Sequence, residues 1–180
     1  MTPFANHIQE YHHRIQTGEI VVGKWIKLVY EYIVTGLETR AFFFDQKRAN
    51  DALEWIESHC FHTEGPLAPS PLKLEVWQKA FVSCIFGIFE PDTLNPYCKE
   101  ILLIIARKNG KSLLASCIAS YILQVKAGYG ARIYTIAPKL EQADIIYGNT
   151  WAMIQLDPEW QESKENIEEQ RRQTHQKVED

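Results

Sequence analysis

Residues 101–112 read ILLIIARKNGKS, and no other stretch limits the possible folds of this chain as strongly. Its first six residues are apolar, as in a strand that is buried on both faces of a parallel sheet. Two cations and an Asn-Gly pair follow, and residues 112–125 then show the apolar spacing of a helix. A buried strand that turns directly into a helix is a basic unit of α/β folds. The sequence therefore predicts an α/β fold around this stretch.

The same alternation continues down the chain. A turn that contains glycine, 126–130, leads to a second predicted strand at 132–137 and a second predicted helix at 140–156. Strand, helix, strand and helix at short spacing are typical of a parallel sheet with right-handed crossovers. We therefore expect residues 101–137 to contribute two strands to one parallel sheet.

Residues 1–62 are predicted to form a helical subdomain. Apolar residues recur there at spacings of three and four, which indicates helices that pack on a core. They do so first at Ile8, Tyr11 and Ile15, and then at Trp25, Leu28, Val29, Tyr32 and Ile33. Residues 41–45, AFFFD, predict a short extended piece, after which Asp45 is expected to cap another amphipathic helix.

Proline and glycine mark the expected domain boundaries. Residues 63–73 contain three prolines and one glycine and predict a linker. Residues 74–156 follow, beginning with a helical pattern at 75–89 and continuing into the α/β alternation. Residues 157–180 predict a polar tail, for which disorder is favoured over a solvated helix.

The composition is that of a soluble globular protein, with 46% hydrophobic and 23% charged residues among 180. Residues 157–180 hold eight of the 23 acidic and four of the 19 basic residues, so the formal charge of −4 belongs to the tail. A surface coated with basic residues is therefore not expected, although a local basic site is possible.

The four cysteines form no C-x-x-C pair, which favours free thiols in a reducing compartment. The longest helical apolar segment, 113–125, is too short to span a bilayer.

Gly110, Lys111 and Ser112 have the residue types of a phosphate-binding loop. Such a loop needs inward backbone N–H groups, a lysine for the β- and γ-phosphates and a hydroxyl that holds Mg²⁺, all at the start of a helix. A chance triplet at a strand–helix turn is the alternative. The predicted strand before it and the helix after it are the context that the motif requires. We therefore predict the N-terminal part of a P-loop NTPase sheet, preceded by the helical subdomain.

The loop departs from the usual pattern G-x-x-x-x-G-K-[ST], whose first glycine would fall at Ile105. Arg107 and Lys108 stand where small residues are common, and solvated charges near a turn are the simplest interpretation. Alternatively, Arg107 places a positive charge beside the γ-phosphate, where the transition state gathers charge. Asn109 is interpreted as a residue that tolerates a strained turn conformation.

The stretch ARKNGKS after a strand, preceded by Leu74, Trp77 and Gln78 in the pattern L-x-x-W-Q, resembles one family closely. This family is the large terminase subunit of tailed bacteriophages, the motor that packages DNA. Its phosphate loop typically carries arginine and departs from the common glycine pattern, as this loop does. A glutamine-alanine pair after the second predicted strand, at 142–143, is also similar. The resemblance covers roughly residues 8–156.

The resemblance implies an ATPase that uses ATP and Mg²⁺. It implies nucleotide contacts for residues of the loop and of the upstream motif, namely Trp77, Gln78, Arg107, Lys108, Asn109, Gly110, Lys111 and Ser112. Lys111 and Arg107 would carry the catalytic roles, Ser112 would hold Mg²⁺, and Gln78 would read the adenine edge while Trp77 packs beside it. Without the resemblance, plain core packing would be the better interpretation of Trp77 and Gln78.

For the full-length protein the resemblance implies double-stranded DNA, the portal protein and the small terminase subunit as partners. It also implies a homo-oligomeric ring on the portal, no membrane, and a location in the cytoplasm of the infected host. A packaging motor needs an acidic pair after a third strand and a nuclease domain, and the sequence contains neither. We therefore interpret the chain as an N-terminal terminase fragment that is inactive by itself. The alternatives are another P-loop ATPase, helicase-like in type, or a truncated, non-catalytic nucleotide-binding or interaction module.

Overall fold

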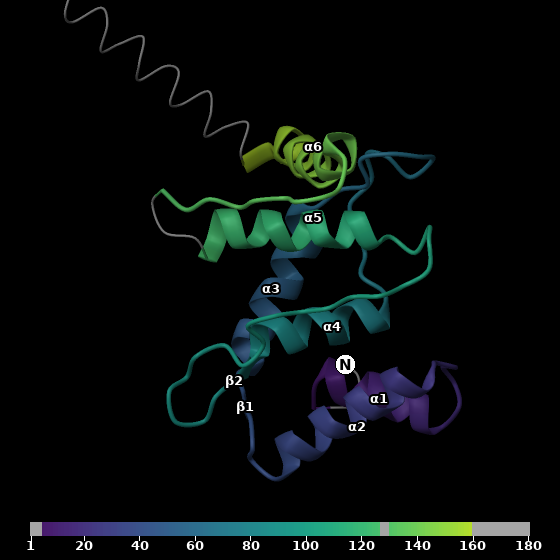
Figure 1. Cartoon of the computed structure of the whole chain (residues 1–180), viewed down its shortest axis with the longest axis vertical. Helices are drawn as coiled ribbons and strands as arrows, with labels where there is room; N and C mark the ends of the chain where they lie inside the picture. Colours follow the sequence, from purple (N-terminus) through teal and green to yellow (C-terminus); the bar gives the residue numbers. More distant parts are fainter. Residues whose placement is uncertain (1–4, 127–129, 160–180) are drawn as a thin grey trace, which may run out of the picture. The chain divides into compact units, whose positions relative to one another are not determined.

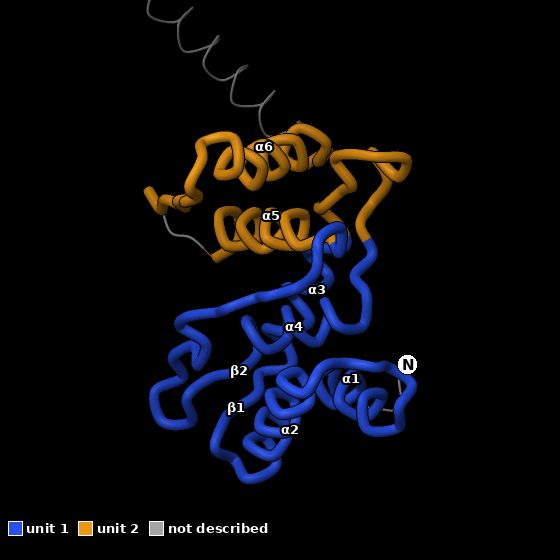
Figure 2. The backbone as a smooth tube through the Cα atoms, turned by 45° about the vertical axis from the view of Figure 1, so that its right-hand side comes forward, with its two compact units in different colours: residues 1–57, 73–109 blue, residues 58–72, 110–180 orange. Residues whose placement is uncertain are grey.

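The computed structural model describes residues 5–126 and 130–159. Its elements in chain order are α1 (His7–Gln16), α2 (Lys24–Glu38), β1 (Phe43–Phe44), α3 (Gln46–His59), α4 (Val76–Gly87), β2 (Ile88–Phe89), α5 (Lys111–Tyr121), a π-helical turn (Ile122–Lys126) and α6 (Leu140–Leu156). The chain divides into two compact units (Figure 2). Unit 1 comprises residues 1–57 and 73–109, and unit 2 comprises residues 58–72 and 110–180.

The core of unit 1 lies where α1 packs against α2 and α4. Helix α1 begins at the Asn6 cap, whose side-chain oxygen accepts a hydrogen bond from the Gln9 N–H at 2.9 Å. Its buried side chains Ile8, Tyr11 and Ile15 were expected from their spacing, and their burial confirms that prediction. They meet side chains of α2, α4 and the neighbouring segments, namely Tyr30, Val34, Phe42, Ala80, Cys84 and Ile88.

Helix α2 buries a different face from the one that the sequence predicts. Trp25, Leu28, Val29 and Tyr32 were expected in the core, yet they are 75%, 49%, 48% and 58% exposed. The core instead receives Tyr30 and Val34, with Ile33 and Leu37 packed against it. The prediction is therefore wrong for these four residues. The reason is that α2 carries apolar residues on two faces, and periodicity alone does not say which face is covered.

Two short strands, β1 and β2, form an antiparallel pair within unit 1. Phe43 and Phe44 of β1 pair with Phe89 and Ile88 of β2, which confirms an extended piece within residues 41–45. The helix predicted over 75–89 ends at Gly87 because the chain there turns into β2. A Cβ on Gly87 would lie only 2.5 Å from Cε2 of Phe44, so this close approach requires glycine. The predicted cap of α3 is confirmed, since Oδ1 of Asp45 accepts from the Arg48 N–H at 3.0 Å.

In unit 2, α5 packs against α6, and small residues allow a close approach. The Ser116 hydroxyl donates to the Ile146 carbonyl at 3.2 Å, and Leu114, Cys117, Tyr121, Met153 and Ile154 are buried. The helices predicted over 112–125 and 140–156 are confirmed as α5 with its π-helical turn, and as α6. Residues 127–129 of the predicted turn and residues 160–180 of the predicted tail lie outside the described residues.

The two predicted parallel strands are not formed. Residues 101–106 and 132–137 have no sheet hydrogen bonds, and β1 with β2 is the only sheet within the described parts of the chain. A strand is held by bonds to a neighbour, and no described segment supplies one here. The apolar side chains of these stretches are consequently open to solvent, with Leu102 84%, Ile104 80% and Ile136 93% exposed. The structure is thus a mixed, helix-rich fold with a small two-stranded sheet.

None of the helices in the described residues combines the length and the apolar character needed to cross a bilayer.

Candidate phosphate-binding site

The turn before α5 has the backbone conformation of a tight loop. Lys108 and Gly110 both adopt positive φ angles, 65° and 68°, and Gly110 is the N-cap of α5. A positive φ is easy for glycine and unusual for lysine. Asn109, which the sequence suggested as the strained residue, instead braces the turn with its side chain. Its Nδ2 donates to the carbonyl of Ala106 at 3.3 Å and to that of Arg107 at 3.4 Å.

The start of α5 presents backbone donors without a side-chain cap. The first backbone bond of this helix runs from the Leu114 N–H to the Gly110 carbonyl at 2.8 Å. The N–H groups of residues 111–113 precede that bond, and the N-cap residue, a glycine, has no side chain to accept from them. The first turn also contains no acidic residue. The positive end of the helix dipole is therefore available to an anion.

Three cations lie close together in the sequence around this helix start. Arg107, Lys108 and Lys111 are exposed, and none of them has a carboxylate within ion-pairing distance among the described residues. Three uncompensated positive charges within five residues add to the helix dipole. The site is thus suited to a polyanion such as a triphosphate.

Ser112 lies in the first turn of α5 and is half-buried. Its carbonyl accepts a hydrogen bond from the Ser116 hydroxyl at 2.9 Å, which fixes the backbone in this turn. In the part of the chain that the structure describes, the Ser112 hydroxyl has no protein partner. A hydroxyl oxygen next to a lysine at a helix start is the ligand type that a magnesium nucleotide requires, so the residues present fit Mg²⁺ with ATP.

Gln78 has a structural partner that the sequence interpretation did not foresee. Its Oε1 accepts from the Glu75 N–H at 2.8 Å, and the Glu75 side chain accepts in return from the Gln78 N–H, which forms a capping box at the start of α4. The spacing E-x-x-Q before an apolar run was the sequence signal for this box. The Nε2 amino group and one lone pair of Oε1 remain for a ligand. Trp77 is half-buried and packs against the core of unit 1.

These residues belong to different units. Trp77, Gln78, Arg107, Lys108 and Asn109 lie in unit 1, whereas Gly110, Lys111 and Ser112 lie in unit 2. The structure brings the last three together at one helix start, directly after the turn formed by 107–109. Participation of Gln78 and Trp77 in the same site stays a prediction.

Within the described residues, no carboxylate side chain contacts the loop formed by residues 107–112. Asp144 is exposed and Glu159 lies 3.4 Å from Nε2 of His59. Asp157 is only 2% exposed, with Oδ1 accepting from the Glu159 N–H at 3.0 Å and Oδ2 lacking a partner among these residues. The described chain also contains no cluster of three or more histidine, cysteine, aspartate or glutamate side chains that suits a metal ion.

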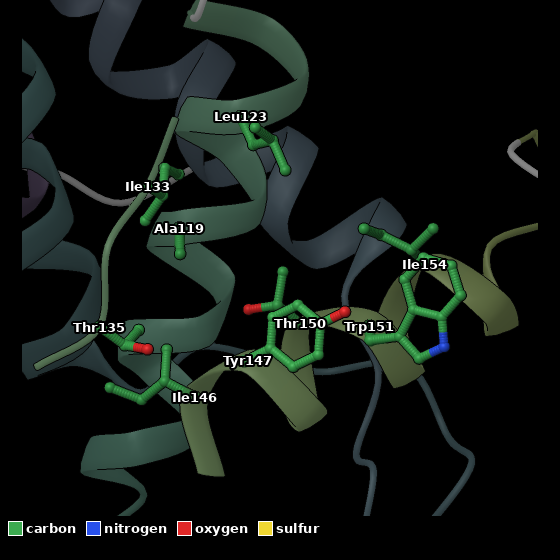
Figure 3. Close-up of a pocket in the computed structure, with 9 residues that line it drawn as sticks. All are labelled: Ala119, Leu123, Ile133, Thr135, Ile146, Tyr147, Thr150, Trp151 and Ile154. Atoms are coloured by element: carbon green, nitrogen blue, oxygen red, sulfur yellow. The ribbon is translucent and has the colours of Figure 1, made fainter. Parts of the chain in front are cut away.

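Unit 2 also has an apolar cleft of about 340 Å³. It lies between α5, α6 and residues 133–135, and Figure 3 shows Leu123, Ile133, Ile146, Tyr147 and Trp151 around it. No charged side chain lines this cleft. It is therefore unsuited to phosphate and is separate in character from the cationic helix start.

Comparisons with known proteins identify the family of this chain. The family described as terminase large subunit, ATPase domain, matches residues 76–180. The large subunit of the terminase from Enterobacteria phage HK97 is 31% identical over 117 residues, which cover 64% of this chain and 22% of that protein. The crystal structure of the HK97 bacteriophage large terminase is similar with a TM-score of 0.52 and 30% identity, again over 64% of this chain and 22% of that one. This chain thus spans about a fifth of the relative's length, and it belongs to the family of terminase large subunit ATPase domains.

Proposed function

We propose that this member of the terminase family binds ATP with Mg²⁺ at the start of α5, as part of a motor that packages double-stranded DNA. The observation that carries the proposal is the helix start itself. It combines an uncapped N-terminus, a left-handed glycine and three cations that no described carboxylate neutralises. Family membership favours a packaging motor over a helicase-like ATPase.

Within the loop each residue has a distinct role in the proposal. The backbone N–H groups that follow Gly110 cradle the phosphates, and the Lys111 ammonium contacts the β- and γ-phosphates. The Ser112 hydroxyl ligates Mg²⁺, which neutralises phosphate charge when bound. Arg107 stabilises the charge that develops on the γ-phosphate in the transition state. Lys108 adds positive potential, and Asn109 keeps the turn closed through its two bonds to carbonyls.

Gln78 and Trp77 supply base recognition in this proposal. A glutamine amide offers one acceptor and one donor, which match the N6 amino group and a ring nitrogen of adenine. The capping box fixes the Oε1 position before any ligand arrives, which lowers the entropy cost of binding. Guanine presents the opposite pattern at that edge, so the amide favours ATP.

In the whole protein we propose that hydrolysis drives DNA into a capsid. The partners would be double-stranded DNA, the portal protein and the small terminase subunit, with several copies in a ring on the portal. The place would be the cytoplasm of the infected bacterium. Support for these partners comes from family membership.

Titration with a fluorescent ATP analogue, with and without Mg²⁺, tests the proposed site. Lys111→Ala should weaken binding at least about 100-fold, because a charge-assisted phosphate contact is worth about 3 kcal/mol. Lys139→Ala is the matched control, since Lys139 is an exposed lysine at the N-cap of the other long helix of unit 2. Equal affinity of both variants and the unaltered chain would refute the phosphate-loop assignment.

A further inference from the structure

Helix α2 carries apolar side chains on two opposite faces. Tyr30, Ile33, Val34 and Leu37 form the face that packs on the core of unit 1. Trp25, Leu28, Val29 and Tyr32 form the other face, which we call the outer face of α2, and it is open to solvent. At about 100° per residue, the centres of these two faces lie roughly 140° apart. In both views α2 lies at the outer edge of unit 1 (Figures 1 and 2).

The polar residues of α2 are confined to one narrow strip between the two faces. This strip consists of Lys24, Lys27, Glu31, Thr35 and Glu38, which the helical repeat places on one side. The side opposite the strip is apolar too, with Ile26 and Gly36. A helix whose polar groups occupy a single strip is normally covered on more than one face. The pattern therefore indicates a partner for the outer face.

The outer face is large enough for a specific interface between two copies. Trp25 and Tyr32 are 75% and 58% exposed, and Val21, one turn before α2, is 92% exposed. Aromatic side chains bury about 150–250 Å² each, so the five residues together offer roughly 500 Å². A symmetric pair would then bury about 1,000 Å² of apolar surface, which is near the lower limit of specific protein interfaces.

The order of the charges along the strip indicates which partner covers the outer face of α2. Lysines stand at the start of α2 and glutamates towards its end, with no acid in the first turn and no base in the last. This order opposes the dipole of the helix itself. A second α2 that runs in the opposite direction compensates for this order, because Lys24 of one copy then lies beside Glu31 of the other. In a parallel two-fold pair the two strips would lie on opposite sides of the contact and could not pair with each other.

We propose that the outer face of α2 is an antiparallel, two-fold interface between two copies of this chain. Trp25, Leu28, Val29 and Tyr32 of each copy form its apolar centre, and the two charged strips lie next to each other along one edge of it. A two-fold contact closes at two copies, so it differs from the head-to-tail contacts of a ring. The inference is independent of nucleotide binding.

Existing contacts hold the interface side chains in place. The Tyr32 hydroxyl lies 3.1 Å from that of Tyr97, and the Tyr32 ring packs edge-on against Phe42 with the ring centroids 5.5 Å apart. Glu31 is held by its Oε2, which lies 2.9 Å from Nε2 of both His12 and Gln16, while the side chain stays 57% exposed. Ordering before association reduces the entropy that binding costs.

Sedimentation of the 180-residue chain over a concentration series up to about 100 µM provides the test, since it detects dissociation constants in the micromolar range. The expected result is a monomer–dimer equilibrium that Leu28→Glu weakens at least about 100-fold, because the pair would bury an unpaired carboxylate. Ile104→Glu is the control, since Ile104 is 80% exposed in the same unit but lies outside the outer face. A chain that stays monomeric throughout would overturn the proposal, as would a dimer that Ile104→Glu disrupts and Leu28→Glu does not.

Charge reversal tests the orientation. Lys24→Glu with Lys27→Glu gives a uniformly acidic strip, and Glu31→Lys gives a more basic one. Each variant alone should dimerise about 10-fold more weakly than the unaltered chain, and an equimolar mixture should form mixed dimers that regain the original strength. Circular dichroism of each variant establishes that the helices are retained. A mixture that associates no better than its components would exclude the antiparallel arrangement.

Discussion

Gln78 has an observed role as a capping residue and a proposed role in binding adenine, and the two can be separated by mutation. Oε1 accepts from the Glu75 N–H at 2.8 Å in a solvent-exposed hydrogen bond. Gln78→Ala removes this bond and should lower the free energy of unfolding by about 1 kcal/mol. If Gln78 also reads adenine, the same change should weaken ATP binding by about 1–3 kcal/mol, or roughly 5- to 150-fold, and GTP binding much less.

Two further variants separate these roles. Gln78→Glu keeps an oxygen that accepts from the Glu75 N–H, as capping boxes with glutamate do, but it lacks the amino donor. It should keep most of the stability and lose the preference for ATP. Glu75→Ala removes the other half of the box and leaves the amide of Gln78 unchanged. It should lose about 1 kcal/mol of stability and retain the preference for ATP.

Calorimetric titration with ATP and with GTP, and urea unfolding of the same four proteins, measure both quantities. The decisive comparison is between Gln78→Glu and Glu75→Ala, whose effects on selectivity and stability should be opposite. If Gln78→Glu kept the full preference for ATP, the adenine role would be refuted and Gln78 would be a capping residue only.

Two other predictions concern hydrolysis and alkaline stability. Phosphate release by the 180-residue chain should not exceed that of Lys111→Ala, because none of Asp144, Asp157 and Glu159 contacts the loop within the described residues; clear turnover above that background would contradict this. Burial raises the pKa of the Cys84 thiol and of the Tyr30 phenol, so the folded state binds these protons more tightly than the unfolded state. The contribution of these two groups to the free energy of unfolding should then be constant below about pH 8 and fall above it by about 1.4 kcal/mol per pH unit for each group that ionises on unfolding, and urea titrations at several alkaline pH values would show whether it does.

Local patterns predicted the helices well, because their determinants lie within a few residues. The spacing of Ile8, Tyr11 and Ile15 identified the buried face of α1, and Asp45 was recognised as the cap of α3. Helix α6 has the predicted bounds. The same reasoning named the residues at the start of α5 as a phosphate loop, because such a loop is formed by consecutive residues, and their role stays a prediction.

Features that depend on distant partners were predicted poorly. The apolar stretch 101–106 has the composition of a strand, but a strand forms only beside another. For α2, periodicity found the apolar positions without deciding between two faces. The capping box at Gln78 is local and is a separate case, because its E-x-x-Q spacing overlaps the L-x-x-W-Q pattern at residues 74–78.

The two sides of the loop differ in how firmly the chain holds them, and this difference bears on nucleotide affinity. On the helix side, α5 packs against α6 and is fixed by the Ser116 bond to Ile146, so Lys111 and Ser112 are set in place. On the other side, residues 101–106 have no sheet hydrogen bonds, and the turn is braced mainly by Asn109. Ordering a residue costs about 1–2 kcal/mol of conformational entropy. A nucleotide that contacts Arg107 as well as Lys111 must therefore offset the entropy cost of ordering the segment that precedes α5. The start of α5 carries no such cost, because it is already held in place. We expect weak binding of ATP by this chain, carried chiefly by the start of α5.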